Sequence, residues 1–253
     1  MSVRLTQFVA EYYKLLVRGC VVILGCAAVC WGIIEFPIFW KEAAAEGIAG
    51  RVIAGDAFKA EILVRQIAII DGVERSGYCR PAALRSAAII QLRMVEVAPP
   101  AKDQEQRNEH LNALSNVIRS ALSCSPADPF LWLVLYWVEG TRTGYKSDHL
   151  KYLQMSYRLG PNEGWIGLKR NALAFENFDQ LSIDLRELVI AEFIGLLKSG
   201  FEEQAADILS GPAWQLRNQL LPHLKSIDER QRKALEYYVS KRRSDVLFPN
   251  IER

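Results

Sequence analysis

The sequence contains few of the residues and motifs on which enzymes and metal proteins usually depend. Its three histidines, His110, His149 and His223, are scattered, and none lies in an HExxH motif or beside a cysteine pair. No GxGxxG, GxxxxGK(S/T) or GxSxG motif occurs, so the signatures of dinucleotide-binding proteins, P-loop enzymes and hydrolases with a nucleophile elbow are missing. We therefore predict no catalytic residue, no metal site and no cofactor.

An excess of charge of one sign is also missing. The chain has 31 lysines and arginines against 29 aspartates and glutamates, which leaves a formal net charge of +2. This balance produces no strong field for a nucleic acid, and we predict no nucleic-acid partner. Acid pairs such as Glu202 and Glu203 fall on amphipathic patterns, where a solvated helix face explains them better than an enclosed acid–base site.

Long stretches of alternating apolar and polar residues, the pattern of a half-buried strand, are absent too. Apolar residues instead recur at helical spacing, as in the segment from Asp103 to Cys124, where Leu111, Leu114 and Ile118 share one face. The start signals of five further helices, an N-cap residue or a first-turn proline, are Asp56, Pro81, Asp128, Asn162 and Asp228. The sequence therefore predicts an all-α fold.

One long hydrophobic run, from Gly19 to Trp40, contains Glu35 as its sole charge. A helix of about 20 apolar residues crosses a hydrocarbon core of about 30 Å, so we predict a single transmembrane helix over residues 15–40. A cleaved signal peptide is the alternative, since Ala43 and Ala45 form an A-x-A site. The length of the run favours an uncleaved anchor. Small residues at Gly25, Ala28 and Gly32 offer a face on which a second helix could pair.

Basic residues beside the span predict its orientation. Lys14 and Arg18 adjoin its N-terminal end, whereas the basic residues on the other side lie farther away, which favours a cytoplasmic N-terminus. In a bacterial inner membrane, residues 1–14 would then form a short cytoplasmic tail and residues 41–55 a glycine-rich hinge. Residues 56–245 would form a periplasmic helical domain, followed by a C-terminal tail over residues 246–253.

Cysteine is scarce outside the span. Cys20, Cys26 and Cys30 fall within it, and the remainder of the chain has only Cys79 and Cys124. In an oxidising compartment these two could form a disulfide. Two buried free thiols are the alternative, because neither cysteine belongs to a CxxC or metal-binding spacing.

Two similar segments follow Pro126. Trp132 and Trp165 lie 33 residues apart, and each is followed three residues later by a leucine, which is similar to the W-x-x-L start of the 34-residue tetratricopeptide repeat. The pattern is incomplete, because Tyr136 stands where that repeat has glycine. We predict a tetratricopeptide-like array of helical hairpins. Its aromatic residues Trp132, Tyr152 and Trp165 could line a partner-binding groove, although core packing also explains aromatic residues at such positions.

Several segments together resemble small membrane-anchored helical-repeat proteins associated with bacterial exopolysaccharide production. They are the N-terminal anchor, CSPADPFLWL, SYRLGPNEGWI, AEFIGLL and the isolated Cys79 and Cys124. The resemblance implies a protein that accompanies polysaccharide polymerisation or export. From the anchor and the paired tryptophan motifs we predict that it is a non-enzymatic adaptor. We expect it to contact membrane lipid, other membrane or periplasmic proteins, and a polysaccharide. A structural accessory subunit of another membrane complex and an enzyme acting on an envelope polysaccharide are the alternatives.

Overall fold

The computed structural model describes residues 2–59, 61–67, 79–97 and 104–243. These residues form helices and connecting turns and no strand, which confirms the predicted all-α class. The chain divides into two compact units, residues 1–94 and 95–253, and each is described separately. The elements are α1 (Ser2–Ile53), α3 (Pro81–Val97), α4 (Gln104–Cys124), α5 (Pro129–Thr143), η1 (Ser147–His149), α6 (Leu150–Leu159), α7 (Gly164–Glu176), η2 (Phe178–Gln180), α8 (Ile183–Lys198), α9 (Glu202–Ser210), η3 (Trp214–Leu216), α10 (Arg217–Leu220), η4 (Leu221–Ser226) and α11 (Glu229–Arg242).

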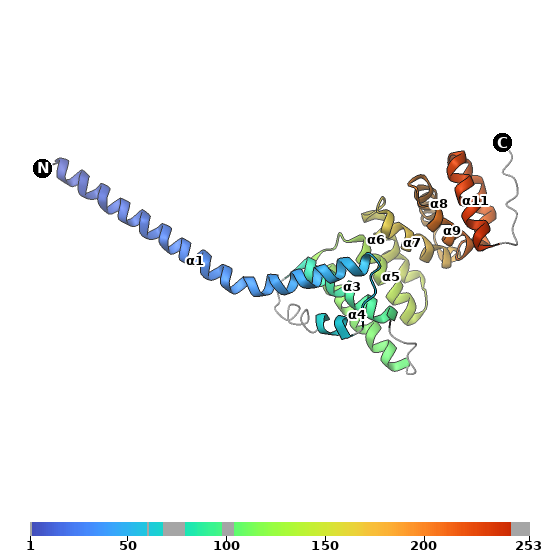
Figure 1. The fold of residues 1–253 in the computed structure, drawn as a ribbon, viewed down its shortest axis with the longest axis horizontal. Helices are drawn as coiled ribbons and strands as arrows, with labels where there is room; N and C mark the ends of the chain where they lie inside the picture. Colours follow the sequence, from blue (N-terminus) through green and yellow to red (C-terminus); the bar gives the residue numbers. More distant parts are fainter. Residues whose placement is uncertain (1, 60, 68–78, 98–103, 244–253) are drawn as a thin grey trace. The chain divides into compact units, whose positions relative to one another are not determined.

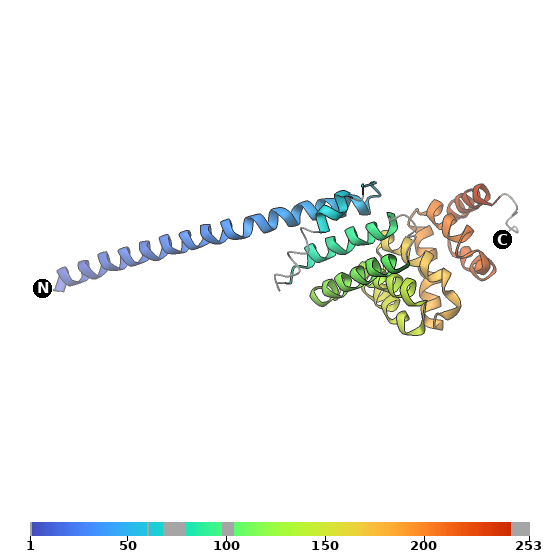
Figure 2. The same cartoon turned by 90° about the horizontal axis from the view of Figure 1, so that it is seen from below.

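Helix α1 is a single helix of 52 residues, seen from two directions in Figures 1 and 2. Its segment Tyr12–Pro37 is long and apolar enough to cross a membrane, and no residue of its most apolar stretch is buried inside the protein. Pro37 lies within the helix and does not end it. The sequence prediction of one helix capable of spanning a membrane is therefore confirmed in length and composition.

The predicted hinge over residues 41–55 is helical as far as Ile53, which differs from our expectation. Gly47 and Gly50 each cost about 1 kcal/mol of helix propensity relative to alanine. Ala45 and Ala49, however, are buried, so packing within the first unit stabilises the helix through this segment. The chain turns only at Gly55, whose φ of 93° lies in the left-handed region that favours glycine.

Asp56 does not begin a helix either. Its carboxylate accepts a hydrogen bond from Arg51 Nε at 2.7 Å, so it is bound to the end of α1, and the next helical residues are 61–67. The C-terminal end predicted for this helix, near Gly72, lies outside the described residues. Asn162 is likewise not a cap, because Glu163 occupies the N-cap position of α7.

Arg80 contacts three residues on one face of α1, near the C-terminal end of its apolar segment. It donates from Nη2 to Glu35 Oε2 at 2.9 Å and from Nη1 to Glu42 Oε1 at 2.8 Å. Its guanidinium carbon lies 5.2 Å from the ring centroid of Phe39. These three α1 residues share a face because they are spaced four and three positions apart. The only charge within the predicted apolar run is thus paired, which lowers the cost of placing it beside lipid.

The helices of the second unit begin largely where the sequence predicts. Asp128 caps α5 by accepting from the backbone N–H groups of Phe130 and Leu131, and Asp228 caps α11 by accepting from Gln231. Helix α8 ends at Lys198. Gly200 follows with a positive φ of 87°, and the N–H of Phe201 donates to the carbonyl of Leu196 in a Schellman motif.

Neighbouring helices of the second unit pack against one another in sequence order. Helix α4 packs on α5, α5 on α6, and α7 on α8, and near the C-terminus α11 packs on α9 (Figure 1). The predicted α4 stripe of Leu111, Leu114 and Ile118 is buried, as are Val189 and Phe193 of α8. Because α5 packs on both α4 and α6, residues from these three helices lie close together.

Candidate functional site

Stacked rings from α5, η1 and α6 form an aromatic cluster on the second unit. Trp132 of α5 stacks on Tyr152 of α6, with ring centroids 6.0 Å apart and an interplanar angle of 19°. His149, one helical turn before Tyr152, stacks on the same tyrosine at 6.4 Å and 16°. We call Trp132, His149 and Tyr152 the aromatic stack. The side chains of all three remain partly accessible.

Local contacts position Trp132 in this stack. Asp128 caps α5 and Pro129 occupies its first turn, so the start of the helix is fixed. The indole Nε1 of Trp132 donates to the carbonyl of Pro126 at 2.8 Å. Because this bond holds the ring by its edge, the two faces of the indole are left for stacking.

Two cations adjoin the aromatic stack. The guanidinium carbon of Arg119, on α4, lies 5.9 Å from the Tyr152 ring centroid, and the Lys151 amine lies 5.2 Å from it. The Arg119 side chain is 51% exposed. The surface therefore combines flat apolar rings with positive charge, which suits a partner that presents a ring or apolar side chain beside a carboxylate.

A buried carboxylate orients Arg119. Glu139 of α5 accepts from Arg119 Nη2 at 2.9 Å, from Ser115 Oγ at 2.8 Å and from Arg142 Nη1 at 3.0 Å. Burial alone raises the pKa of Glu139, but the hydrogen bonds from Arg119 and Ser115 and the nearby charge of Arg142 outweigh it and lower the pKa overall. Glu139 is thus ionised at neutral pH and keeps Arg119 beside the stack.

The structure divides the three residues predicted to line a partner groove. Trp132 and Tyr152 lie together, whereas Trp165 packs on Phe130 at a ring-centroid distance of 5.2 Å. Trp165 is 38% exposed. The sequence prediction omitted His149, whose spacing of three residues from Tyr152 was a usable signal. It also omitted Arg119, which reaches the stack from another helix and which spacing along the chain could not reveal.

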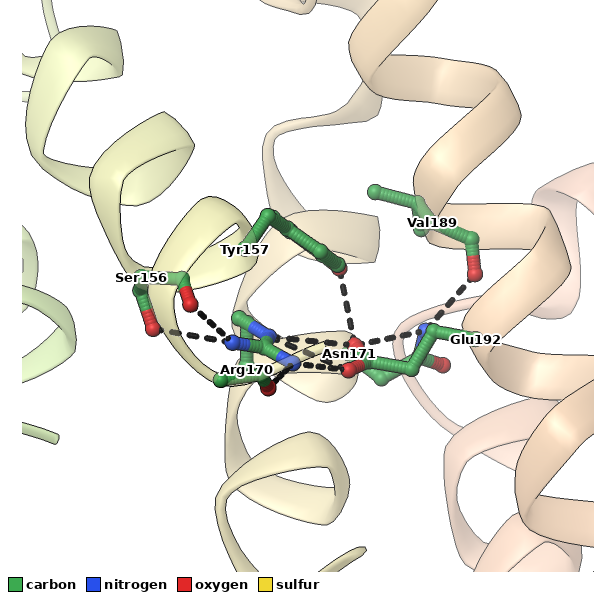
Figure 3. Close-up of polar contacts among 7 residues, drawn as sticks. Ser156, Tyr157, Arg170, Asn171, Val189 and Glu192 are labelled. Atoms are coloured by element: carbon green, nitrogen blue, oxygen red, sulfur yellow. Dashed lines mark hydrogen bonds and ion pairs between the residues drawn. The ribbon is translucent and has the colours of Figure 1, made fainter. Parts of the chain in front are cut away.

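A second polar cluster, shown in Figure 3, lies between α6, α7 and α8. Arg170 of α7 is completely buried. Its Nε and Nη2 donate to Glu192 of α8, and its Nη1 and Nη2 donate to the carbonyls of Ser156 and Gly160 at 2.6 and 2.9 Å. Those carbonyls belong to the C-terminal end of α6, so Arg170 satisfies helix-end acceptors as well as pairing with a carboxylate.

Glu192 is fully used by its own neighbours in this cluster. Tyr157 donates its hydroxyl to Oε2 at 2.9 Å, and Asn171 Nδ2 lies 3.5 Å from the same oxygen (Figure 3). Burial, followed by the charge of Glu192, raises the pKa of Tyr157 well above its usual value. Because the guanidinium donors and both carboxylate oxygens are engaged by residues of α6, α7 and α8, this cluster fastens these helices together.

The predicted helix-pairing residues lie on the exposed part of α1. Gly25, Ala28 and Gly32 are all exposed, and a Cβ atom added at either glycine would meet no atom within 4 Å. Among the cysteines, Cys79 and Cys124 are each disulfide-bonded, whereas Cys20, Cys26 and Cys30 are free. Within the described residues, no group of three or more His, Cys, Asp or Glu side chains is arranged to hold a metal ion.

Comparison with protein-family models and with curated proteins finds no match for this chain. The chemistry of its surfaces is therefore the basis for a functional proposal.

Proposed function

We propose that this protein is a non-enzymatic, membrane-anchored adaptor whose helical domain binds protein partners through the aromatic stack. The observation that carries the proposal is the stacking of Trp132 on Tyr152 at a partly accessible surface, with Arg119 and Lys151 beside it. Tryptophan, tyrosine and arginine are the residues that most often dominate the energy of protein interfaces. The partner segment presents an aromatic or proline ring next to an acidic side chain.

The order of the helices supports a tetratricopeptide-like organisation. Trp132 lies on α5 and Trp165 on α7, which are the first helices of the successive pairs α5–α6 and α7–α8. Leu135, three residues after Trp132, is buried, as a core position of such a repeat requires. Stacks of helical hairpins present extended surfaces to partners.

The oxidation state of two cysteines supports a periplasmic location for the domain. Disulfide-bonded Cys79 and Cys124 suit an oxidising compartment such as the bacterial periplasm. Together with Lys14 and Arg18 before the span, this favours a cytoplasmic N-terminus and a single pass through the inner membrane. In this location the adaptor would serve an assembly for exopolysaccharide polymerisation or export.

Photocrosslinking in intact cells tests the proposal. A benzoylphenylalanine at Trp132 in the full chain is expected to capture one defined envelope protein, and a Lys151→Glu change is expected to reduce that capture by about tenfold, since it reverses a charge at the stack. Tyr237 of α11, which is 54% exposed, is the matched control position. Equal capture from Trp132 and Tyr237, or capture that is insensitive to Lys151→Glu, would argue against the adaptor surface.

The link to polysaccharide is tested separately. Cells that carry Lys151→Glu in place of the wild-type chain are expected to export less polymer while keeping a normal amount of the protein in the membrane. Unchanged polymer output together with lost crosslinking would retain the adaptor but exclude the polysaccharide assembly as its context.

A further inference from the structure

An open groove of about 970 Å³ runs along α8, on the second unit and away from the aromatic stack residues. Its α8 wall consists of Glu187, Ile190, Ala191, Ile194, Gly195 and Lys198, and its other wall is formed by η4. The α8 residues recur every three or four positions, so they form one continuous helix face about 16 Å long. The groove is apolar along its middle, with a carboxylate at one end of the α8 wall and an amine at the other.

Gly195 lies in the interior of α8 without an evident intramolecular reason. An interior glycine destabilises a helix by about 0.5–1 kcal/mol relative to alanine. Beside Gly140 and Gly167, a Cβ atom would approach Tyr145 or Glu192 closely, so those glycines make room for neighbouring side chains. A Cβ atom at Gly195 would meet nothing within 4 Å. The space above Gly195 is thus available to a second backbone or a large side chain from outside the chain.

The face has a pattern that complements itself under two-fold symmetry. When a helix packs against an antiparallel copy of itself, residues whose numbers have a constant sum lie opposite each other. For a sum of 385, Glu187 faces Lys198 of the second copy, because 187 + 198 = 385. For the same sum the partly buried Ile190 faces Gly195, whereas Ile194 is 8% exposed and belongs to the core of its own chain. The bulky Ile190 therefore meets the small Gly195, and each charge meets its opposite.

The charged ends of this face are free to pair with another molecule. Within residues 104–243, the side chains of Glu187 and Lys198 form no ion pair or hydrogen bond with another side chain, and both residues are exposed. A two-fold pairing would form the Glu187–Lys198 bridge twice. The predicted membrane anchor would also confine the copies to one surface, which raises their effective concentration.

From this pattern we infer that a second copy of the chain occupies the groove, so that two α8 helices pack antiparallel in a symmetric homodimer. This inference is independent of the aromatic stack and of the partner proposed to bind there. It assigns Gly195 the role of receiving Ile190 from the second copy. Glu187 and Lys198 then select the antiparallel register through charge.

Charge reversal tests this register directly. The full chain in detergent micelles is expected to sediment as a dimer, and Glu187→Lys or Lys198→Glu alone is expected to weaken the dimer by about tenfold, because each creates two like-charge contacts. An equimolar mixture of the two variants is expected to restore dimerisation, since lysines at 187 and 198 of one chain then meet glutamates of the other. Pairing through the transmembrane segment would not respond to the mixture in this way.

Substitutions at Gly195 test the size complementarity. Gly195→Phe fills the groove and is expected to weaken the dimer on the order of a hundredfold, because overpacking repeats at both symmetric positions. Gly195→Ala is the matched control, which leaves most of the space open and raises thermal stability through helix propensity. Circular dichroism checks that both variants remain helical.

Three outcomes would overturn the inference. They are a wild-type chain that stays monomeric at every concentration, a variant mixture that fails to restore the dimer, and a groove that binds only a different protein. Restoration by the mixture together with disruption by Gly195→Phe would establish the second copy as the occupant.

Discussion

Arg170 and Glu192 form an ion pair between α7 and α8 in which the guanidinium is wholly buried and the carboxylate side chain is 8% exposed. The same guanidinium donates to the last carbonyls of α6. One side chain therefore connects three consecutive helices. A buried pair of this kind is stabilising only while every donor and acceptor is satisfied.

Replacing Glu192 with glutamine should destabilise the domain by about 3 kcal/mol, because it leaves the Arg170 charge buried without its counter-charge. Urea denaturation followed by circular dichroism measures the change. Glu203→Gln is the control, since the bridge of Glu203 to Arg242 is long, at 3.8 Å, and its carboxylate is exposed, so its loss should cost less than about 1 kcal/mol. Equal effects of the two substitutions would contradict the structural role assigned to the buried pair.

Glu139 should make the stability of the helical domain sensitive to acid. Its folded pKa lies below the usual value of 4.5, because the hydrogen bonds from Arg119 and Ser115 outweigh the effect of burial. A carboxylate whose pKa is lower in the folded state than in the unfolded state stabilises the fold at pH values above its unfolded pKa. This stabilisation is lost as the pH falls through the folded pKa. The free energy of unfolding of wild-type protein should therefore fall below about pH 4.5 more steeply than that of Glu139→Gln. Parallel profiles for the two proteins would exclude this linkage.

A disulfide between Cys79 and Cys124 should be found by peptide mapping under non-reducing conditions. It would close a loop spanning 124 − 79 = 45 positions, for which the chain-entropy model gives a stabilisation of about 4 kcal/mol. The variant with serine at both Cys79 and Cys124 should lose about that amount of unfolding free energy. A variant with serine at Cys20, Cys26 and Cys30, all free thiols, should keep the crosslink, and detection of intermolecular bonds instead would disprove the pairing.

Alkaline carbonate washing should leave the intact chain in the membrane fraction, because Tyr12–Pro37 presents its apolar side chains on all sides. Arginine introduced at Val22 and Val29, near the centre of this segment, should reduce membrane retention. Each buried arginine opposes insertion by about 2.5–3.5 kcal/mol. Release of the unmodified, full-length chain by the wash would refute the membrane anchor.

Substitutions at Gly25 and Gly32 test whether α1 also pairs with another helix. A Cβ atom at Gly25 or Gly32 would meet no atom within 4 Å, and both positions are exposed, so isoleucine at both should leave the fold unaffected. If α1 packs on a helix of a membrane complex, co-purification of that complex should drop at least tenfold, because close backbone approach is blocked. Leucine at Val21, an exposed position of similar depth, is the control and should change nothing.

Several helix boundaries could be predicted because their signals are local. Asp128 and Asp228 accept hydrogen bonds from backbone N–H groups within three residues, and Pro81 begins α3. Such capping depends on neighbours in the chain and can be read without a fold. The same kind of signal was misleading at Asp56, because Arg51 at the end of α1 binds its carboxylate instead.

The candidate site was only partly predictable. Trp132 and Tyr152 were singled out by their aromatic character and do stack, but Trp165 packs on Phe130 in a separate contact. Arg119 comes from a different helix, and its position beside Tyr152 depends on how α4 packs relative to α5 and α6. Helical periodicity indicates which side of a helix is apolar and does not indicate which residue of another helix will meet it.

Sequence alone determined the all-helical class and the presence of one helix able to cross a membrane, because periodicity, capping and hydrophobic length act within a single segment. Only the tertiary structure decided that Arg170 meets Glu192, that Arg80 neutralises Glu35, and that α1 continues through Gly47 and Gly50. These features depend on packing between segments far apart in the chain, where burial and the satisfaction of buried charge outweigh local preference.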